Sequence, residues 1–165
     1  MVFHGAYDRY HHGEARPDLQ FHIIPQTTGT YYFWIASDDN SQLWLSPNSD
    51  PATKVMIASL SGYANWHEWN KYSSQKSGPI NLTAGVRYYV EVLHNEGNEN
   101  DNLSVGWLTP GQGGSEPSEV IPSSVLSPYI VPSIPEAPDN LTATAISATQ
   151  VDLTWRDNSN NENGF

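Results

Sequence analysis

The chain has 165 residues, with 18 acidic residues against 7 lysines and arginines, a formal net charge of −11 and no cysteine. Such a charge argues against nucleic acid and anionic membranes as partners, because phosphate surfaces are bound through clusters of Lys and Arg. The lack of cysteine excludes disulfides and thiolate metal sites.

Aromatic residues and turn formers dominate the composition, with 6 Trp, 9 Tyr, 4 Phe, 12 Gly and 12 Pro. No long helical pattern accompanies them, and this combination indicates an all-β protein. Short strands separated by turn signals are predicted at 20–25, 30–37, 41–46, 54–60, 79–83, 86–94 and 103–110. Regular short strands of this kind predict a β-sandwich or barrel.

Two polar loops interrupt the strands, at 61–78 and 95–102. The first carries Trp66 and Trp69. Trp69 is expected to pack the loop onto the sandwich. Trp66 is either a second anchor or an exposed indole that stacks on a sugar ring, and the sequence leaves both alternatives open.

The strand aromatics are expected to contribute to the core. Residues 31, 33 and 35 alternate with residues 32 and 34, so one of these sets should face inward. Trp44 and Trp107 are both expected in the core or between the sheets.

The composition changes after residue 110. Residues 111–138 are rich in Pro, Ser and Gly and predict a linker, although five of its residues are able to pack back on the domain: Val120, Ile121, Val125, Leu126 and Tyr129. Beyond it, LTATAIS and QVDLTW predict two strands joined by a turn.

Two adjacent carboxylates, Asp38 and Asp39, lie between the second and third predicted strands. In an extended trans chain they would point to opposite faces, and the triplet with Asn40 is common in hairpin turns. A cis peptide bond would bring the two Cα atoms to about 2.9 Å and present both side chains to one cation. Oxygen donors alone would suit Ca²⁺ rather than Zn²⁺. The residues by themselves leave turn and metal clamp open.

Three stretches resemble the PA-14 domain, the β-sandwich module named after anthrax protective antigen and also found in yeast flocculins and bacterial glycosidases. They are PQTTGTYYFWIASDDNSQLWLS, QKSGPINLTAGVRYYVEVLHNEG and DNLSVGW, and the resemblance covers about residues 19–110. It implies a PA-14-like sandwich with jelly-roll character over 1–110, with one or two N-terminal strands missing or replaced. The stretch PEAPDNLTATAISATQVDLTWRDNSNNENGF resembles the start of a fibronectin type III domain, which predicts an incomplete module at 139–165.

The resemblance also implies a site. In the lectin-like members an Asp-Asp pair joined by a cis bond holds Ca²⁺, and the ion coordinates sugar hydroxyls. The metal ligands implied here are Asp38, Asp39, Asn95 and the carbonyl groups of Gly97 and Glu99. The glycan is expected to meet the two aspartates together with Trp66, Glu96, Asp101 and Asn102.

The predicted function is that of a calcium-dependent carbohydrate-binding module in a larger secreted or cell-surface protein of bacterial origin, beside other domains of that protein. The alternative is a metal-free structural or protein-interaction module appended to an extracellular enzyme or adhesin. No catalytic residue is assigned, because the sequence has no GxSxG, HExxH or phosphate loop. His67 and His94 lack a metal-ligand spacing and are assigned structural or surface roles.

Overall fold

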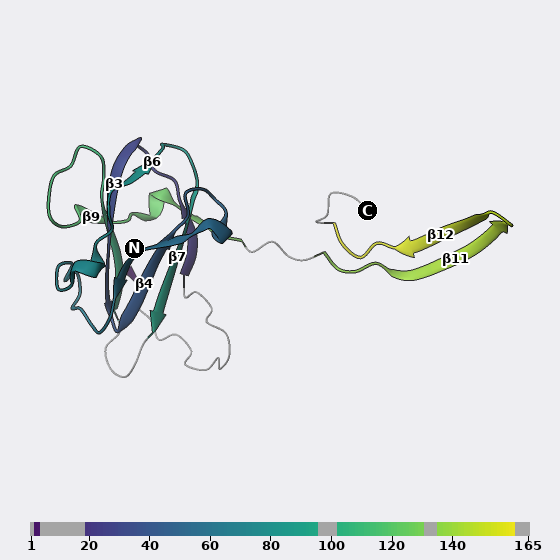
Figure 1. Ribbon diagram of the computed structural model, residues 1–165, viewed down its shortest axis with the longest axis horizontal. Helices are drawn as coiled ribbons and strands as arrows, with labels where there is room; N and C mark the ends of the chain where they lie inside the picture. Colours follow the sequence, from purple (N-terminus) through teal and green to yellow (C-terminus); the bar gives the residue numbers. More distant parts are fainter. Residues whose placement is uncertain (1, 4–18, 96–101, 131–134, 161–165) are drawn as a thin grey trace. The chain divides into compact units, whose positions relative to one another are not determined.

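The computed structural model describes residues 2–3, 19–95, 102–130 and 135–160. The chain divides into two compact units, Met1–Tyr129 and Ile130–Phe165. The first is an all-β sandwich of two antiparallel sheets, and the second contains a single hairpin (Figure 1). Within the described ranges, none of the helices has the length and apolar character needed to cross a membrane.

One sheet contains five strands in the order β1-β8-β3-β6, with β9 paired to β8. Their bounds are Val2–Phe3 for β1, Gly29–Asp38 for β3, Ile80–Leu82 for β6, Asn102–Leu108 for β8 and Glu119–Val120 for β9. The longest pairing joins β3 to β8 and runs from Tyr32 to Asp38. This sheet therefore ends on the first of the two adjacent aspartates.

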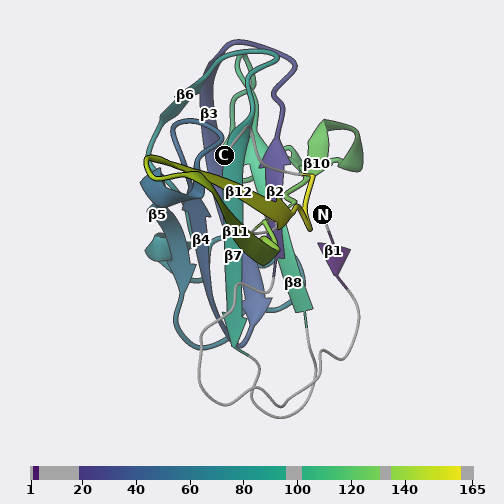
Figure 2. The same ribbon diagram turned by 90° about the vertical axis from the view of Figure 1, so that its right-hand side faces the viewer.

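The other sheet contains five strands in the order β10-β2-β7-β4-β5. Figure 2 shows β2, β7, β4 and β5 as neighbours in one layer. Their bounds are Leu19–Ile23 for β2, Asn40–Leu45 for β4, Val55–Leu60 for β5, Tyr88–Asn95 for β7 and Leu126–Pro128 for β10. The chain passes between the sheets several times, and two of these connections join β3 to β4 and β7 to β8.

The main core lies between the sheets. Alternate residues of β3 enter it, namely Tyr31, Phe33 and Ile35, because neighbouring side chains of a strand point to opposite faces. They meet alternate residues of β7 and β4, and Trp107 of β8, which is 3% exposed. The prediction that Trp107 belongs to the core is confirmed.

Trp44 does not share this position. Leu43 and Leu45 of β4 enter the core, so Trp44 lies half-buried on the outer face of the strand. Its Nε1 donates to Oε1 of Gln42 at 3.1 Å on the same face. The prediction of a core position for Trp44 is wrong, and the alternation of Gln42, Leu43, Trp44 and Leu45 was the signal that places it outside.

A second apolar cluster covers the outer face of β3. Its members are Trp34, Ala36, Leu60, Ala64, Trp69 and Leu108. The loop at 61–78 closes over this face, and Trp69, 8% exposed, confirms the predicted packing role. Both faces of β3 are therefore buried, and a strand buried on both sides holds its ends in fixed positions.

The same loop also satisfies the backbone at the edge of β3. The buried side chain of Gln75 donates to the carbonyl groups of Ile35 at 2.9 Å and Glu68 at 2.7 Å. Ser77 binds both backbone groups of Phe33. Its N–H donates to the Phe33 carbonyl, and its side-chain hydroxyl accepts from the Phe33 N–H. A buried backbone group without a hydrogen bond costs free energy of folding. The loop therefore supplies the hydrogen bonds that a neighbouring strand would otherwise provide.

The first unit continues past the boundary expected at residue 110. Strands β9 and β10 pair with β8 and β2, and Ile121 and Val125 are buried in the main core. Pro117 packs so tightly on Gly106 that a Cβ at the glycine would lie 2.7 Å from the proline ring. The expectation that apolar residues of this stretch pack back on the domain agrees with these contacts.

The second unit holds the two strands predicted after residue 138. They are β11, Asp139–Ser147, and β12, Gln150–Arg156, which pair in antiparallel fashion with two shifts of register. The assignment of this segment to a fibronectin type III domain stays a prediction.

Candidate functional site

The ends of β3 and β7 and the starts of β4 and β8 meet at one end of the sandwich. Asp38, the last residue of β3, lies opposite Asn102, the first residue of β8. Asn40, the first residue of β4, lies opposite Asn95, the last residue of β7. Polar residues from both sheets are therefore gathered around Asp39, because these four strands begin or end there.

Hydrogen bonds hold the Asp38–Asp39 segment in place, and its peptide bond is cis. The hydroxyl of Ser37 donates to the carbonyl of Asp39 at 2.7 Å and lies 2.6 Å from the hydroxyl of Ser41. Nε2 of His94 donates to the carbonyl of Asp38 at 2.9 Å. The backbone carbonyl groups of both aspartates are thus engaged by the protein, which fixes the positions of the two residues.

The carboxyl groups of the pair influence each other directly. Burial raises the pKa of Asp38, and the neighbouring charge of Asp39 and a hydrogen bond with its side chain raise the pKa further. His94 and Lys71 act in the opposite direction, because positive charge near a carboxylate favours its ionised form. Two carboxyl groups that share one small region form an arrangement that a cation relieves.

Asn102 adds an oxygen to this region. Its side-chain NH₂ donates to the carbonyl of Ala64 at 3.1 Å, which fixes the orientation of the amide. The other end of the amide, Oδ1, is buried and has no hydrogen-bond partner among the described residues. A buried polar atom without a partner is rare in a native protein and calls for an explanation such as a bound ion or water.

The donors present fit a hard cation. Among the residues that the structure describes, no three His, Cys, Asp or Glu side chains form a metal-binding group. The available set consists instead of the carboxylates of Asp38 and Asp39 and the amide oxygen of Asn102, and oxygen donors of this kind suit Ca²⁺. Asn95 is exposed at the end of β7, opposite Asn40.

Four of the predicted site residues lie outside the described residues. They are Glu96, Gly97, Glu99 and Asp101. Their assigned roles as metal or glycan ligands stay predictions.

The aromatic loop at 61–78 borders the same end of the sandwich. Trp66 is 44% exposed and stacks on the imidazole of His67, with ring centroids 4.3 Å apart and planes 18° apart. His67 stacks in turn on the buried indole of Trp69 at 5.2 Å. The exposed indole of Trp66 is therefore held in a fixed position by a continuous stack of rings. This position is compatible with Trp66 as a loop anchor and with Trp66 as a surface that stacks on a sugar.

Sequence reasoning missed three contributors to this site. Ser37 and His94 fix the backbone of the pair, and Lys71 sets a positive charge near Asp38 while its ammonium group covers the ring of Tyr63 at 3.4 Å. The position of His94 at the end of a strong strand was the signal available for it. Lys71 gave none, because only the folding of the loop brings it near the pair.

Comparison with known proteins gives several relatives of parts of this chain, among them the following three. It is 38% identical over 114 residues to N-acetyl-beta-glucosaminyl-glycoprotein 4-beta-N-acetylgalactosaminyltransferase 1 of Mus musculus, a match that covers 65% of the chain and 11% of that protein. It is 31% identical over 103 residues to fibrocystin of Canis lupus familiaris, covering 54% of the chain and 2% of that protein. It is 36% identical over 74 residues to fibrocystin-L of Mus musculus, covering 45% of the chain and 2% of that protein.

The chain thus spans 11% or less of the length of these relatives. The activities of those whole proteins are therefore not assigned to this chain. The model of the PA14 domain matches residues 22–120, which include both sheets from β2 to β9. Because this match covers more than half of the chain, the protein belongs to the PA14 domain family.

Proposed function

We propose that this module binds carbohydrate through a Ca²⁺ ion held by Asp38, Asp39 and the side chain of Asn102, with Asn95 as a further ligand. Bound Ca²⁺ accepts about 6–8 oxygen ligands, so protein donors leave coordination positions for neighbouring hydroxyl groups of a sugar. The module serves a secreted or cell-surface protein, in which several copies or domains add avidity to a weak single contact.

The observation that carries the proposal is the unpartnered Oδ1 of Asn102 opposite Asp38. An acceptor oxygen that is buried, oriented by Ala64 and adjacent to a carboxyl group gains no hydrogen bond from the described residues. A cation would satisfy this oxygen and both carboxylates together. A structural hairpin turn requires the aspartates but gives no reason for this amide.

The exposed aromatic loop supports a glycan as the ligand. The stacked indole of Trp66 presents a rigid apolar surface beside the polar end of the sandwich, and aromatic rings pack well on the C–H faces of sugars. The name of one relative describes an enzyme of glycoprotein glycans, although the match covers only 11% of that enzyme. No catalytic group is proposed for this chain.

A melting experiment tests the metal. Excess CaCl₂ should raise the melting temperature relative to EDTA, because a ligand at 100 times its Kd stabilises the folded state by about 2.7 kcal/mol. The variants Asp38→Asn and Asp39→Asn should lose this shift. Asp152→Asn, on the hairpin of the second unit, removes the same charge and should keep the shift. Equal shifts in all four proteins would remove the pair from the site.

A glycan array tests the sugar. Binding is measured in CaCl₂ and in EDTA for the wild type and for Asp39→Asn. Signals that require both Ca²⁺ and Asp39 support the proposal. Binding that survives EDTA would contradict the role of Ca²⁺ in sugar binding. A calcium-dependent melting shift without any bound glycan would favour a metal-supported scaffold over a lectin.

A further inference from the structure

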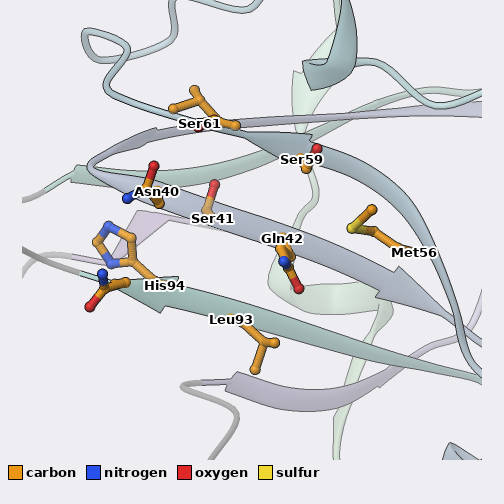
Figure 3. Close-up of a pocket in the computed structure, with 10 residues that line it drawn as sticks. Asn40, Ser41, Gln42, Met56, Ser59, Ser61, Leu93 and His94 are labelled. Carbon is orange, nitrogen blue, oxygen red and sulfur yellow. The ribbon is translucent and has the colours of Figure 1, made fainter. Parts of the chain in front are cut away.

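A groove of about 700 Å³ opens beside the aspartate pair, on the second sheet (Figure 3). Its volume falls within the range of roughly 300–1,000 Å³ that is usual for small-molecule sites. Its lining comes from β4, β5, the residue after β5, and β7. The ten residues are Asn40, Ser41, Gln42, Met56, Ser59, Leu60, Ser61, Leu93, His94 and Asn95.

The groove is lined by residues that neighbour the aspartate pair in sequence or in strand pairing. Asn40 follows Asp39 directly, and His94 and Asn95 end the neighbouring strand. Figure 3 shows the side chains of Asn40 and His94 close together at one end, with Gln42 farther along β4 and Met56 on the neighbouring strand β5. A ligand that extends from the aspartates along β4 would therefore meet the residues of the groove.

The strand register places four of the lining side chains on the outer face of the sheet. Gln42 lies opposite Leu93 on one side and opposite Ser59 on the other, so these three side chains are neighbours. A shift of register between β4 and β5 at Leu43 and Trp44 brings Met56 to the same outer face. Such bulges re-aim side chains and occur often beside binding sites.

His94 is the one ionisable residue in the lining, although the chain carries a formal charge of −11. Six lining residues have amide or hydroxyl side chains, three are apolar, and none is Asp, Glu, Lys or Arg. A sugar ring presents hydroxyl groups at its edge and C–H groups on its faces, and this lining matches both.

Two amides are oriented for donation. Oε1 of Gln42 accepts from the indole N–H of Trp44, and Oδ1 of Asn40 accepts from the backbone N–H of Gly62 at 2.7 Å. Among the described residues neither amide NH₂ has an acceptor, so these donors remain for a ligand. Fixed donors along a groove with an apolar floor are typical of sites that read hydroxyl groups.

We infer that the groove holds the second and later units of a neutral oligosaccharide whose first unit binds at the aspartate pair. This inference rests on the proposed function, and it deepens that function from binding one sugar to binding a chain of neutral sugars. The outer face of β4 then sets the preference for chain length, and Trp44 acts as a positioning residue for Gln42.

The test compares sugars of different length in CaCl₂, by calorimetric titration. The probes are the pairs galactose and lactose, mannose and mannobiose, and N-acetylglucosamine and chitobiose, with sialyllactose as the charged probe. In the pair that binds, the disaccharide should bind about tenfold more tightly than the monosaccharide, and sialic acid should add nothing.

Two variants locate the gain. Gln42→Ala removes one donor and should weaken the disaccharide about threefold to tenfold, while Ser59→Tyr fills the groove and should abolish the gain. Both should keep the calcium-dependent melting shift and the affinity for the monosaccharide. The exposed Gln26→Ala is the matched control and should behave as the wild type.

The outcomes separate the two proposals. Equal affinity for monosaccharide and disaccharide, or a gain that survives both variants, would overturn the groove but leave calcium-dependent sugar binding intact. Absence of binding by any probe, together with absence of a calcium shift, would overturn both.

Discussion

Asn102 and Asp38 face each other across strands β8 and β3, and the side-chain oxygen of Asn102 is buried there without a hydrogen-bond partner among the described residues. Ala64 orients this amide from the loop that covers β3. The relationship joins the loop, both sheets and the aspartate pair at one end of the sandwich. It also makes Asn102 the most informative position for substitution.

Asn102→Asp should change stability in opposite directions with and without calcium. In EDTA a third carboxylate beside Asp38 and Asp39 would repel them and lower the melting temperature. In CaCl₂ the added charge would strengthen the metal site, so the calcium-dependent shift should exceed that of the wild type. Asn102→Ala should reduce the shift, because it removes the oxygen.

The control for this experiment is Asn81→Asp, which makes the same charge change on β6. There the side-chain oxygen accepts from the hydroxyl of Thr30, a bond that a carboxylate also accepts. Similar shifts for the variants at positions 81 and 102 would show that general charge, rather than the site, is responsible.

The two tryptophans of the loop should separate binding from folding. Trp69→Ala empties a buried position and should lower the free energy of unfolding by about 3–5 kcal/mol, whereas Trp66→Ala should cost about 1 kcal/mol or less. Trp66→Ala should nevertheless weaken glycan binding in CaCl₂. Urea denaturation and calorimetric titration measure the two effects. Unchanged binding by Trp66→Ala would assign the indole to packing alone.

Strand composition was enough to predict most of the sandwich. The runs around Phe33 and Val90 are rich in aromatic and β-branched residues, and β3 and β7 form there as expected. Strands β9 and β10 were not predicted as strands, because two or three residues among prolines give no period. Their pairing depends on Ile121 and Val125 reaching a core that other strands build.

Only the part of the candidate site that consists of adjacent residues could be predicted from the sequence. Asp38 and Asp39 stand out because two carboxylates are adjacent, and burial followed by the charge of Asp39 raises the pKa of Asp38. The orientation of Asn102 depends on a carbonyl 38 residues away, and that of Gln42 depends on the outward position of Trp44. Such contacts follow from strand register and loop closure, which no local pattern encodes.

The segment after residue 110 should be required for stability. Ile121 is 2% exposed in the main core, so Ile121→Ala should lower the free energy of unfolding of the first unit by about 2–4 kcal/mol. Ile130→Ala is the matched control, since this side chain is 81% exposed. Urea denaturation followed by tryptophan fluorescence measures both variants. An equally small loss of stability in the two variants would indicate that the segment is a linker.

Tyr89 should make the folded state sensitive to alkali. Its side chain is fully buried, and its hydroxyl donates to Oε2 of Glu91 at 2.6 Å, an oxygen that also lies 3.3 Å from the ammonium group of Lys54. Burial raises the pKa of Tyr89 well above its ordinary value of 10.0, and the hydrogen bond to Glu91 and its charge act in the same direction.

The sign of the effect follows from proton binding. Below pH 10.0 the phenol is protonated in both folded and unfolded states, so the stability it provides is fully present. As the pH rises above that value, the unfolded chain loses this proton before the folded protein does, and the free energy of unfolding falls. Urea denaturation at pH 8 and pH 10.5 should therefore show a smaller loss for Tyr89→Phe than for the wild type. The exposed Tyr63→Phe is the matched control, and an equal loss in the two variants would contradict the assignment to Tyr89.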